Sequence, residues 1–191
     1  QGEEIGMTNP DYDDISVYRD IESHNAYRDL KLAGLTHQEA MRIIKQKSRD
    51  NSRTPMQWDS SPHAGFTTGE PWLQVASNYP EVNVEKELAE GKIFRYYQEL
   101  IGIRKEHPVI ADGSYEGILL DDPEVFAYIR ENEEEKVLVL NHFYAGDYTI
   151  SVPKDWANKA SSVLAGNYGE RQLTPTFTLK PYETIAFRMI K

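Results

Sequence analysis

The sequence contains no cysteine among its 191 residues. That absence excludes disulfide bonds, thiolate metal sites and a cysteine nucleophile, and it is typical of a reducing compartment. Long hydrophobic runs are missing too: apolar stretches such as "VLVL" (137–140) are too short to cross a bilayer. The first residues lack the basic region and apolar core of a signal peptide. We therefore predict a cytoplasmic protein with no membrane partner.

Positive charge is also scarce. Lysine and arginine number 21 against 31 aspartate and glutamate residues, which gives a net charge of −10. A phosphate backbone binds clustered cations, so we expect no nucleic-acid partner. The histidines show no metal-ligand spacing, and nucleotide-binding or serine-hydrolase motifs do not occur. We expect no metal and no cofactor, and a small neutral substrate stays open.

Helical patterns fill the part of the chain before residue 110. Residues 15–34 predict a helix closed by Gly34, and residues 36–48 predict a second one with Thr36 and Glu39 at the spacing of a capping box. An irregular section, 49–83, follows, and such a long loop is typical of a functional site. Residues 91–108 predict a third helix that Pro108 stops. Its apolar face is formed by Phe94, Tyr97, Leu100, Ile101 and Ile103.

After Pro108 the hydrophobic period shortens to two, which indicates strands. The candidates are 113–120, 124–132, 136–143, 147–153, 161–168, 174–181 and 183–190. Their regular spacing predicts an antiparallel β-sandwich. Its expected core includes Phe126, Tyr128, Val137, Val139, Ile150, Val152, Ile185 and Phe187. We predict two domains, 1–108 and 109–191, and expect the second to fold by itself.

The loop "SRDNSRTPMQW" (48–58) places two guanidinium groups, Arg49 and Arg53, four residues apart in a polar segment. Such a loop is suited to bind a ligand, although Arg49 has the alternative role of bracing the loop through Asp50. Glycoside hydrolysis is performed by a pair of carboxylates. Because the sequence contains 31 Asp and Glu residues, a pair can always be found, and its presence does not indicate a glycosidase. The motifs define no self-contained catalytic centre.

Five segments carry a resemblance: "QGEEIGMTNPDY", "YRDIESHN", "SRDNSRTPMQWD", "HAGFTTGEPW" and "NYPEVNVEKEL". In this order they resemble the C-terminal third of the bacterial oligo-1,6-glucosidase and trehalose-6-phosphate hydrolase group of the α-amylase superfamily. The resemblance covers essentially the whole chain. It implies an α+β fragment, namely the end of a (β/α)₈ barrel followed by an antiparallel β-sandwich. The absence of an initiator Met before "QGEEIGM" fits a piece of a longer protein.

The resemblance also implies how function is divided. The catalytic residues of the group come from the fourth, fifth and seventh barrel strands, all upstream of Gln1, so the chain alone is expected to be inactive. Arg53 matches an arginine that grips the glucose in the cleavage subsite, and Glu22 matches a glutamate of the next subsite. Arg49 is included as a substrate-binding candidate. Exposed glutamates in the middle of a helix are common, however. The alternative for Glu22 is therefore an ordinary surface residue without a role in binding.

Further side chains have two interpretations each. Gln1, Glu3 and Glu4 are expected either at the pocket floor or as dipole partners of a helix start. Trp58, Phe66 and Trp72 are suited to stack on sugars, and we expect them instead to pin the long loop to the barrel.

The expected activity is that of a retaining α-glucosidase. "YRDIES" and "KSRDNSRTP" resemble the trehalose-6-phosphate hydrolases more than the oligo-1,6-glucosidases, which favours trehalose 6-phosphate as substrate ahead of isomalto-oligosaccharides. The alternative is a non-catalytic β-sandwich module, structural or carbohydrate-binding. A row of exposed aromatics on one sandwich face would favour that alternative, and the strand sequences indicate no clear row.

Overall fold

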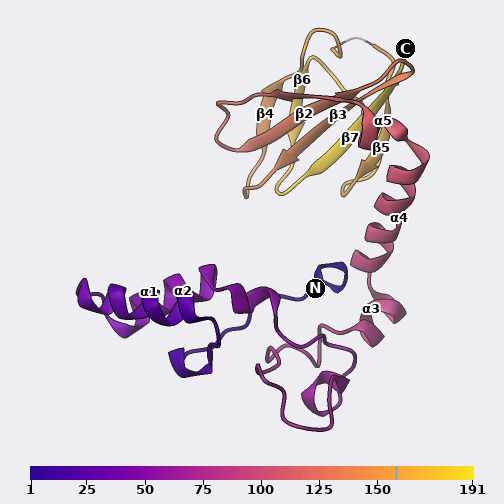
Figure 1. Cartoon of the computed structure of the whole chain (residues 1–191). Coiled ribbons are helices and arrows are strands. Elements are labelled where there is room, and N and C mark those ends of the chain that lie inside the picture. The colour runs from indigo at the N-terminus through magenta and orange to yellow at the C-terminus, as the bar shows by residue number, and fades with distance from the viewer. Residues whose placement is uncertain (158) are drawn as a thin grey trace. The chain divides into compact units, whose positions relative to one another are not determined.

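The computed structural model describes residues 1–157 and 159–191. The chain divides into two compact units, Gln1–Gln98 and Glu99–Lys191. Helices and loops make up the first unit, whereas the described strands all belong to the second (Figure 1). The change from helical to strand pattern predicted near residue 110 is therefore confirmed.

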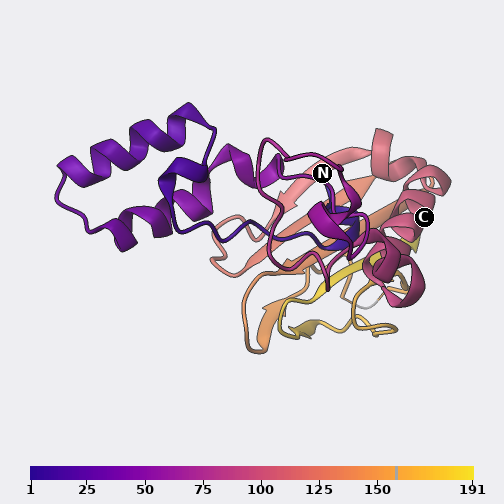
Figure 2. The same ribbon diagram turned by 90° about the horizontal axis from the view of Figure 1, so that it is seen from below.

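The first unit is built around two helices, α1 and α2, which lie side by side in both views of the ribbon (Figures 1 and 2). Its elements in chain order are η1 (Glu3–Ile5), η2 (Ile15–Val17), α1 (Ile21–Leu32), α2 (His37–Lys47), η3 (Arg49–Ser52), η4 (Pro62–Gly65), α3 (Val84–Glu90) and the start of α4 (Ile93–Glu106). The η elements are single 3₁₀ turns or little more. α1 and α2 are the longest helices that lie wholly within this unit.

The prediction of one helix over 15–34 is wrong at its start. Asp20 has an extended backbone, and its carboxylate accepts the Glu22 N–H, so α1 begins only at Ile21. Asp14 caps the separate turn η2 in the same way. The hydrophobic period could not choose between two aspartates that are both suited to begin a helix. At the other end, Gly34 has φ +93° and closes α1 as predicted.

The start of α2 follows the prediction closely. Thr36 and Glu39 form the reciprocal capping box, in which each side chain accepts the other's backbone N–H. The helix buries Met41 and Ile44 in a small cluster with Tyr12 and Tyr18. This cluster joins α2 to the segment that leads into α1.

Residues 49–83 were predicted to be irregular, and within this described section the only helical turns are η3 and η4. Backbone contacts nevertheless hold the section together. The Trp58 N–H donates to the Ala64 carbonyl at 2.9 Å, and the Val84 N–H donates to the Gln57 carbonyl at 2.9 Å. The fully buried Gln57 side chain also donates to the Val82 carbonyl. The two ends of this long loop are therefore tied together near α3.

The predicted helix 91–108 is present as α4, but its apolar side is not covered. None of its residues is buried, and Ile93, Leu100 and Ile101 are clearly exposed. α4 ends at Glu106, before Pro108, as expected. Pro108 then begins a further short helix, α5 (Pro108–Asp112), because proline is well suited to the first helical position.

All seven predicted strands are present. They are β1 (Ser114–Ile118), β2 (Val125–Glu131), β3 (Glu135–His142), β4 (Tyr148–Ser151), β5 (Ser162–Gly166), β6 (Thr176–Leu179) and β7 (Thr184–Ile190). They form an antiparallel sheet in the order β1-β2-β3-β7-β5 and a second sheet of β4 and β6. The register of β5 on β7 shifts between Val163 and Ala165, which marks a β-bulge at this edge.

The core between the two sheets contains Trp156, Phe177, Phe187 and aliphatic side chains of β2, β3, β4 and β7. The predicted core residues Ile150, Val152, Ile185 and Phe187 belong to it. The prediction is wrong for β2, where Val125, Ala127 and Ile129 face the core. Phe126 is exposed and Tyr128 is only half-buried, because alternate residues of a strand point to opposite faces.

The opposite face of the large sheet carries further side chains that the sequence assigned to the core. Val137 is buried there near α5, and Val139 is half-buried. Glu135, also buried, accepts from the Arg188 guanidinium and lies 3.3 Å from His107 Nδ1. Although burial raises the pKa of Glu135, the Arg188 and His107 contacts together hold it below its ordinary value. An ion pair thus fixes the start of β3 to β7.

We expect residues 107–191 to fold without the first unit, because the core and the Glu135 ion pair lie wholly within this span. Trp156 is the single tryptophan of the span and is buried in its core, so its fluorescence reports tertiary packing. Thermal unfolding followed by this fluorescence and by far-ultraviolet circular dichroism should give one coincident transition. Leu140→Ala should lower the free energy of unfolding by about 2–5 kcal/mol. Two separate transitions, or none, would contradict the expectation.

Candidate functional site

The loop that carries the two predicted arginines begins directly after α2. Ser48 caps the turn η3, because its hydroxyl accepts the Asp50 N–H at 3.2 Å. The same hydroxyl lies 2.8 Å from the Ser23 hydroxyl of α1. The turn ends at Arg53, whose N–H donates to the Asp50 carbonyl at 2.9 Å. The loop is therefore fixed to both helices of the first unit.

Asp50 lies beneath this turn with a side chain that solvent does not reach. Its Oδ2 accepts the backbone N–H groups of Arg19 at 2.6 Å and Asp20 at 2.9 Å. Its Oδ1 makes no hydrogen bond among the residues that the structure describes. A buried carboxylate with one oxygen fully engaged and one open is unusual, because burial of an unpaired charge is costly.

Arg53 is placed above this open oxygen. Its Nη1 lies 3.9 Å from Asp50 Oδ1, and 47% of its side chain is exposed. The distance is longer than a hydrogen bond but short enough for charge attraction. A guanidinium carries five N–H donors, and the half-exposed side chain leaves part of the group accessible to solvent.

Glu22 and Arg49 lie together at the surface. The Arg49 Nη2 contacts Glu22 Oε2 at 2.8 Å, and about two thirds of each side chain is exposed. The alternative role predicted for Arg49 named the wrong partner: Arg49 pairs with Glu22, and Asp50 faces Arg53 instead. Whether Arg49 braces the loop or binds substrate stays a prediction. The two predicted residues form one neutral pair that bridges α1 and the loop.

The N-terminal segment also contacts the loop. Gln1 donates from Nε2 to the Thr54 carbonyl at 2.8 Å, and Glu3 accepts from the Tyr97 hydroxyl at 3.0 Å. A hollow of about 300 Å³ lies between this segment and η3. It is lined by Gln1, Glu3, Met7, Thr8, Asn9, Gln46, Ser48, Asn51 and Ser52. Gln1 and Glu3 line this hollow, whereas Glu4, Arg53 and Glu22 do not. The expectation that Gln1, Glu3 and Glu4 form the floor of a substrate pocket stays a prediction.

The aromatic side chains of the long loop remain accessible. Trp58, Phe66 and Trp72 are each roughly half exposed. The backbone carbonyl of Trp72 accepts from Arg19 Nε at 3.2 Å, which ties this part of the loop to the segment before α1. The expectation that the three rings pin the loop to a barrel stays a prediction.

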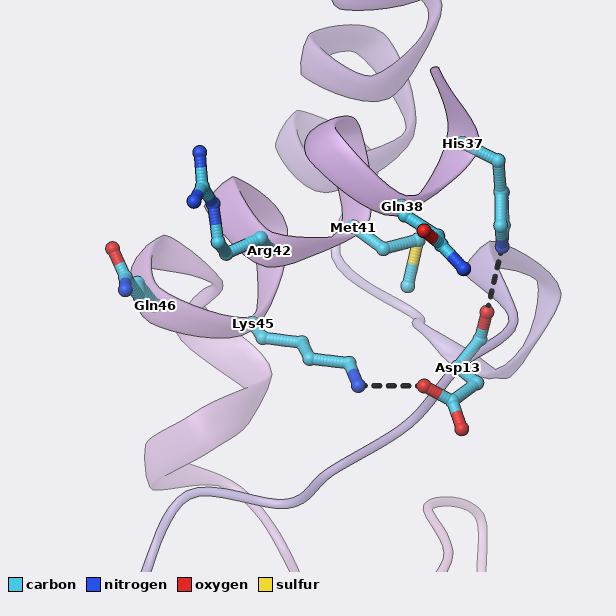
Figure 3. Close-up of a pocket in the computed structure, with 7 residues that line it drawn as sticks. All are labelled: Asp13, His37, Gln38, Met41, Arg42, Lys45 and Gln46. Atoms are coloured by element: carbon cyan, nitrogen blue, oxygen red, sulfur yellow. Dashed lines mark hydrogen bonds and ion pairs between the residues drawn. The ribbon is translucent and has the colours of Figure 1, made fainter. Parts of the chain in front are cut away.

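A larger hollow of about 530 Å³ lies on α2, away from the predicted residues (Figure 3). In this view the side chains of Lys45 and His37 are directed at Asp13. Lys45 Nζ lies 2.6 Å from the Asp13 carboxylate and also contacts Asp11, while His37 Nε2 lies 3.0 Å from the Asp13 carbonyl. The Lys45 ammonium lowers the pKa of Asp13, and the two carboxylates raise the pKa of Lys45. The charges of Lys45, Asp11 and Asp13 satisfy one another, whereas Arg42 lines the hollow outside this group.

Sequence reasoning missed the packing of two buried tyrosines, Tyr12 and Tyr18, in the cluster with Met41 and Ile44. Burial, together with the charges of Tyr18 and Asp50, raises the pKa of Tyr12 to about 12, and burial also raises the pKa of Tyr18. The two rings pack edge to face with centroids 5.5 Å apart. Both phenols stay protonated near neutral pH and support the site without exchanging protons. The only feature of the sequence that could have indicated this packing is the presence of two tyrosines, Tyr12 and Tyr18, shortly before α1.

The described residues contain no group of three or more His, Cys, Asp or Glu side chains placed to hold a metal ion. None of the helices in the described part of the chain is long and apolar enough to cross a membrane.

Comparison with known proteins decides the family. A family model described as the α-amylase catalytic domain matches residues 1–113, and one described as the C-terminal domain of the α-amylase SusG matches residues 125–186. The chain belongs to the α-amylase family. The fold class predicted from the sequence, a barrel end followed by an antiparallel sandwich, is thereby confirmed. The predicted domain boundary at 108/109 stays a prediction, since the compact units divide at 98/99.

Individual relatives of this α-amylase family chain include two glycosidase groups. It is 46% identical to a trehalose-6-phosphate hydrolase of Bacillus subtilis, with 100% of this chain and 35% of the relative aligned. It is 45% identical to an oligo-1,6-glucosidase of Halalkalibacterium halodurans over 96% of this chain and 33% of the relative. The crystal structure of Bacillus licheniformis trehalose-6-phosphate hydrolase gives a TM-score of 0.89 at 46% identity, over 100% of this chain and 35% of that one. The chain spans about a third of the length of these relatives.

The exposed Glu22–Arg49 pair should contribute little to stability, below about 1 kcal/mol, because solvent screens it. Glu22→Gln and Arg49→Gln, made singly and together in the 191-residue chain, should shift the melting temperature only slightly, and less still at high salt. A double-mutant cycle by thermal unfolding measures the coupling. Coupling well above 1 kcal/mol would instead assign the pair a bracing role and count against a substrate-facing one.

Proposed function

We propose that this chain is the C-terminal part of a retaining α-glucosidase that hydrolyses α-glucosidic bonds in small sugars. It supplies a substrate-binding loop, and the catalytic carboxylates come from outside its sequence. The observation that carries the proposal is the placement of Arg53: it stands half exposed at the rim of the loop, above a buried carboxylate. The identity to trehalose-6-phosphate hydrolase and oligo-1,6-glucosidase relatives supports the reaction class.

Within the proposed site, Arg53 donates hydrogen bonds to hydroxyls of the glucose that is cleaved. The rigid fork of a guanidinium suits a pair of adjacent hydroxyls better than an ammonium does. Glu22 and Arg49, 2.8 Å apart, border the next sugar position and offer both an acceptor and donors there. The loop thus contributes binding energy and orientation to a reaction performed by other residues.

Trehalose 6-phosphate is the first substrate that we propose, and isomalto-oligosaccharides are the second. The loop sequence "KSRDNSRTP" supports this order. The identities to the two groups of relatives, 46% and 45%, are too close to add to it.

A chimera tests the proposal: these 191 residues replace the matching region of the Bacillus licheniformis enzyme. The chimera should hydrolyse trehalose 6-phosphate, whereas the 191-residue chain alone should not. In the chimera, Arg53→Ala should lower kcat/KM by about 2–4 kcal/mol in equivalent free energy, because a charge-assisted hydrogen bond is lost in the bound state. Arg53→Lys should recover little of this loss.

The matched control is Arg28→Ala, which removes another exposed arginine of the same unit. It should leave the kinetics near those of the unmodified chimera. Kinetics of Arg53→Ala within a factor of three of the parent, measured well below its melting temperature, would remove Arg53 from the site. A folded chimera without activity on either substrate would reject the proposed reaction.

A second candidate function rests on an observation that the sequence did not reveal. Phe126, Tyr128 and Tyr115 form a connected aromatic group on the outer face of the large sheet, with ring centroids 5.6 and 5.5 Å apart. Tyr115 and Phe126 are more than half exposed. Exposed rings on a sheet are suited to stack on sugars, so this face favours the alternative of a carbohydrate-binding module.

Sugar binding by residues 107–191 separates the two candidates. If the aromatic face binds sugar, isothermal titration with isomaltotriose should give a signal that Tyr115→Ala removes. Tyr168→Ala, which alters another exposed tyrosine of the same unit, should leave it unchanged. A flat titration with all three proteins would reject the module and leave the α-glucosidase proposal unaffected.

A further inference from the structure

The buried carboxylate of Asp50 is the part of the loop that the proposed function leaves without a role. Solvent does not reach the side chain, yet a charge in such a place needs partners. Oδ2 has two, the backbone N–H groups of Arg19 and Asp20. Oδ1 has no hydrogen-bond partner among the described residues, and it is the atom that faces the Arg53 guanidinium at 3.9 Å.

Attraction between these two groups is less screened than between two surface charges, because the carboxylate is out of solvent. The backbone reinforces it: the Arg53 N–H donates to the Asp50 carbonyl, so both the main chain and the side chain of Asp50 act on Arg53. By contrast, Arg49 is paired with Glu22 at the surface. The two arginines of the loop are thus held by different carboxylates.

The same carboxylate also fixes the start of α1. Asp20 caps that helix, and its backbone N–H is one of the two groups bound to Asp50 Oδ2. Ser23 extends the connection, because its hydroxyl donates to Asp20 Oδ2 at 3.2 Å and lies 2.8 Å from the Ser48 hydroxyl. Glu22 lies in this first turn, so its position depends on Asp50 as well.

We propose that Asp50 is a positioning residue that orients the Arg53 guanidinium and sets its place relative to the first turn of α1. It does not touch substrate; it holds one side of the guanidinium so that the remaining N–H donors point to the sugar. This inference rests on the proposed function for its use in catalysis. The geometric part, Asp50 acting on Arg53, is testable without any activity.

The first experiment measures the Arg53 side chain by nuclear magnetic resonance in the 191-residue chain. Arg53→Lys identifies the Nε–H signal by its disappearance. Asp50→Asn should shift this signal and speed the rotation of the guanidinium. The neutral amide of asparagine does not attract the guanidinium as the carboxylate does. Asp122→Asn is the matched control: this aspartate also accepts two backbone N–H groups, from Glu124 and Val125 at 2.9 Å each, but belongs to the second unit. An Arg53 signal that Asp50→Asn leaves unchanged would overturn the proposal.

If Asp50→Asn does not fold, the reverse measurement tests the same contact. Arg53→Ala alters a half-exposed side chain and leaves the buried network in place. It should change the ¹³C chemical shift of the Asp50 carboxylate, whereas Arg49→Ala should not. If both variants change the ¹³C chemical shift of Asp50 equally little, Arg53 is not the specific partner of Asp50. That result would reject the proposal.

A double-mutant cycle in the enzyme chimera then tests the catalytic use. Asp50→Asn should lower kcat/KM at least tenfold, and adding it to Arg53→Ala should cause almost no further loss, since both act through one guanidinium. Additive losses would mean that Asp50 has a structural role alone, and would overturn the proposal. If Arg53→Ala itself is silent while the resonance coupling is present, the proposed function fails and the geometric inference stands.

Discussion

The first unit of this chain depends on one constraint, a carboxylate that is out of solvent and must be satisfied. Asp50 meets part of that requirement with the backbone N–H groups of residues 19 and 20, which lie thirty residues earlier in the sequence. Those contacts bring the segment before α1 against the loop after α2. The arrangement of Glu22, Arg49 and Arg53 is linked to this connection. Asp50 binds the residues at the start of α1, the helix that carries Glu22, and it lies in the turn η3 beside Arg49 and Arg53. Three exposed charged side chains are thus linked to one buried carboxylate.

The sequence predicted those features whose cause is local. The capping box at Thr36 and Glu39, the glycine stop at Gly34 and the strand periods after Pro108 each depend on residues within a few positions of one another. The start of α1 was missed because Asp14 and Asp20 are equally good caps. The tertiary contact with Asp50, which accepts the backbone N–H of residue 20, was not visible in the sequence.

The faces of β2 and the partners of the loop arginines show a second limit. Both sides of β2 are apolar, so a period of two indicates a strand without saying which side is buried, and the larger rings of Phe126 and Tyr128 suggested the wrong one. Arg53 was found through its motif. The Glu22–Arg49 pair could not be found, because these charges lie far apart in the sequence and are brought together only by folding. Asp50 is only three residues from Arg53, but the sequence did not show which of the two loop arginines it faces.

The bulge in β5 has a consequence for the behaviour of the sandwich in solution. β5 is an edge strand, and an edge presents unpaired N–H and C=O groups that another chain can bind. The register shift between Val163 and Ala165 interrupts the regular spacing of those groups. An incoming strand therefore finds no continuous ladder along this edge, and the irregularity protects the β-unit against edge-to-edge aggregation.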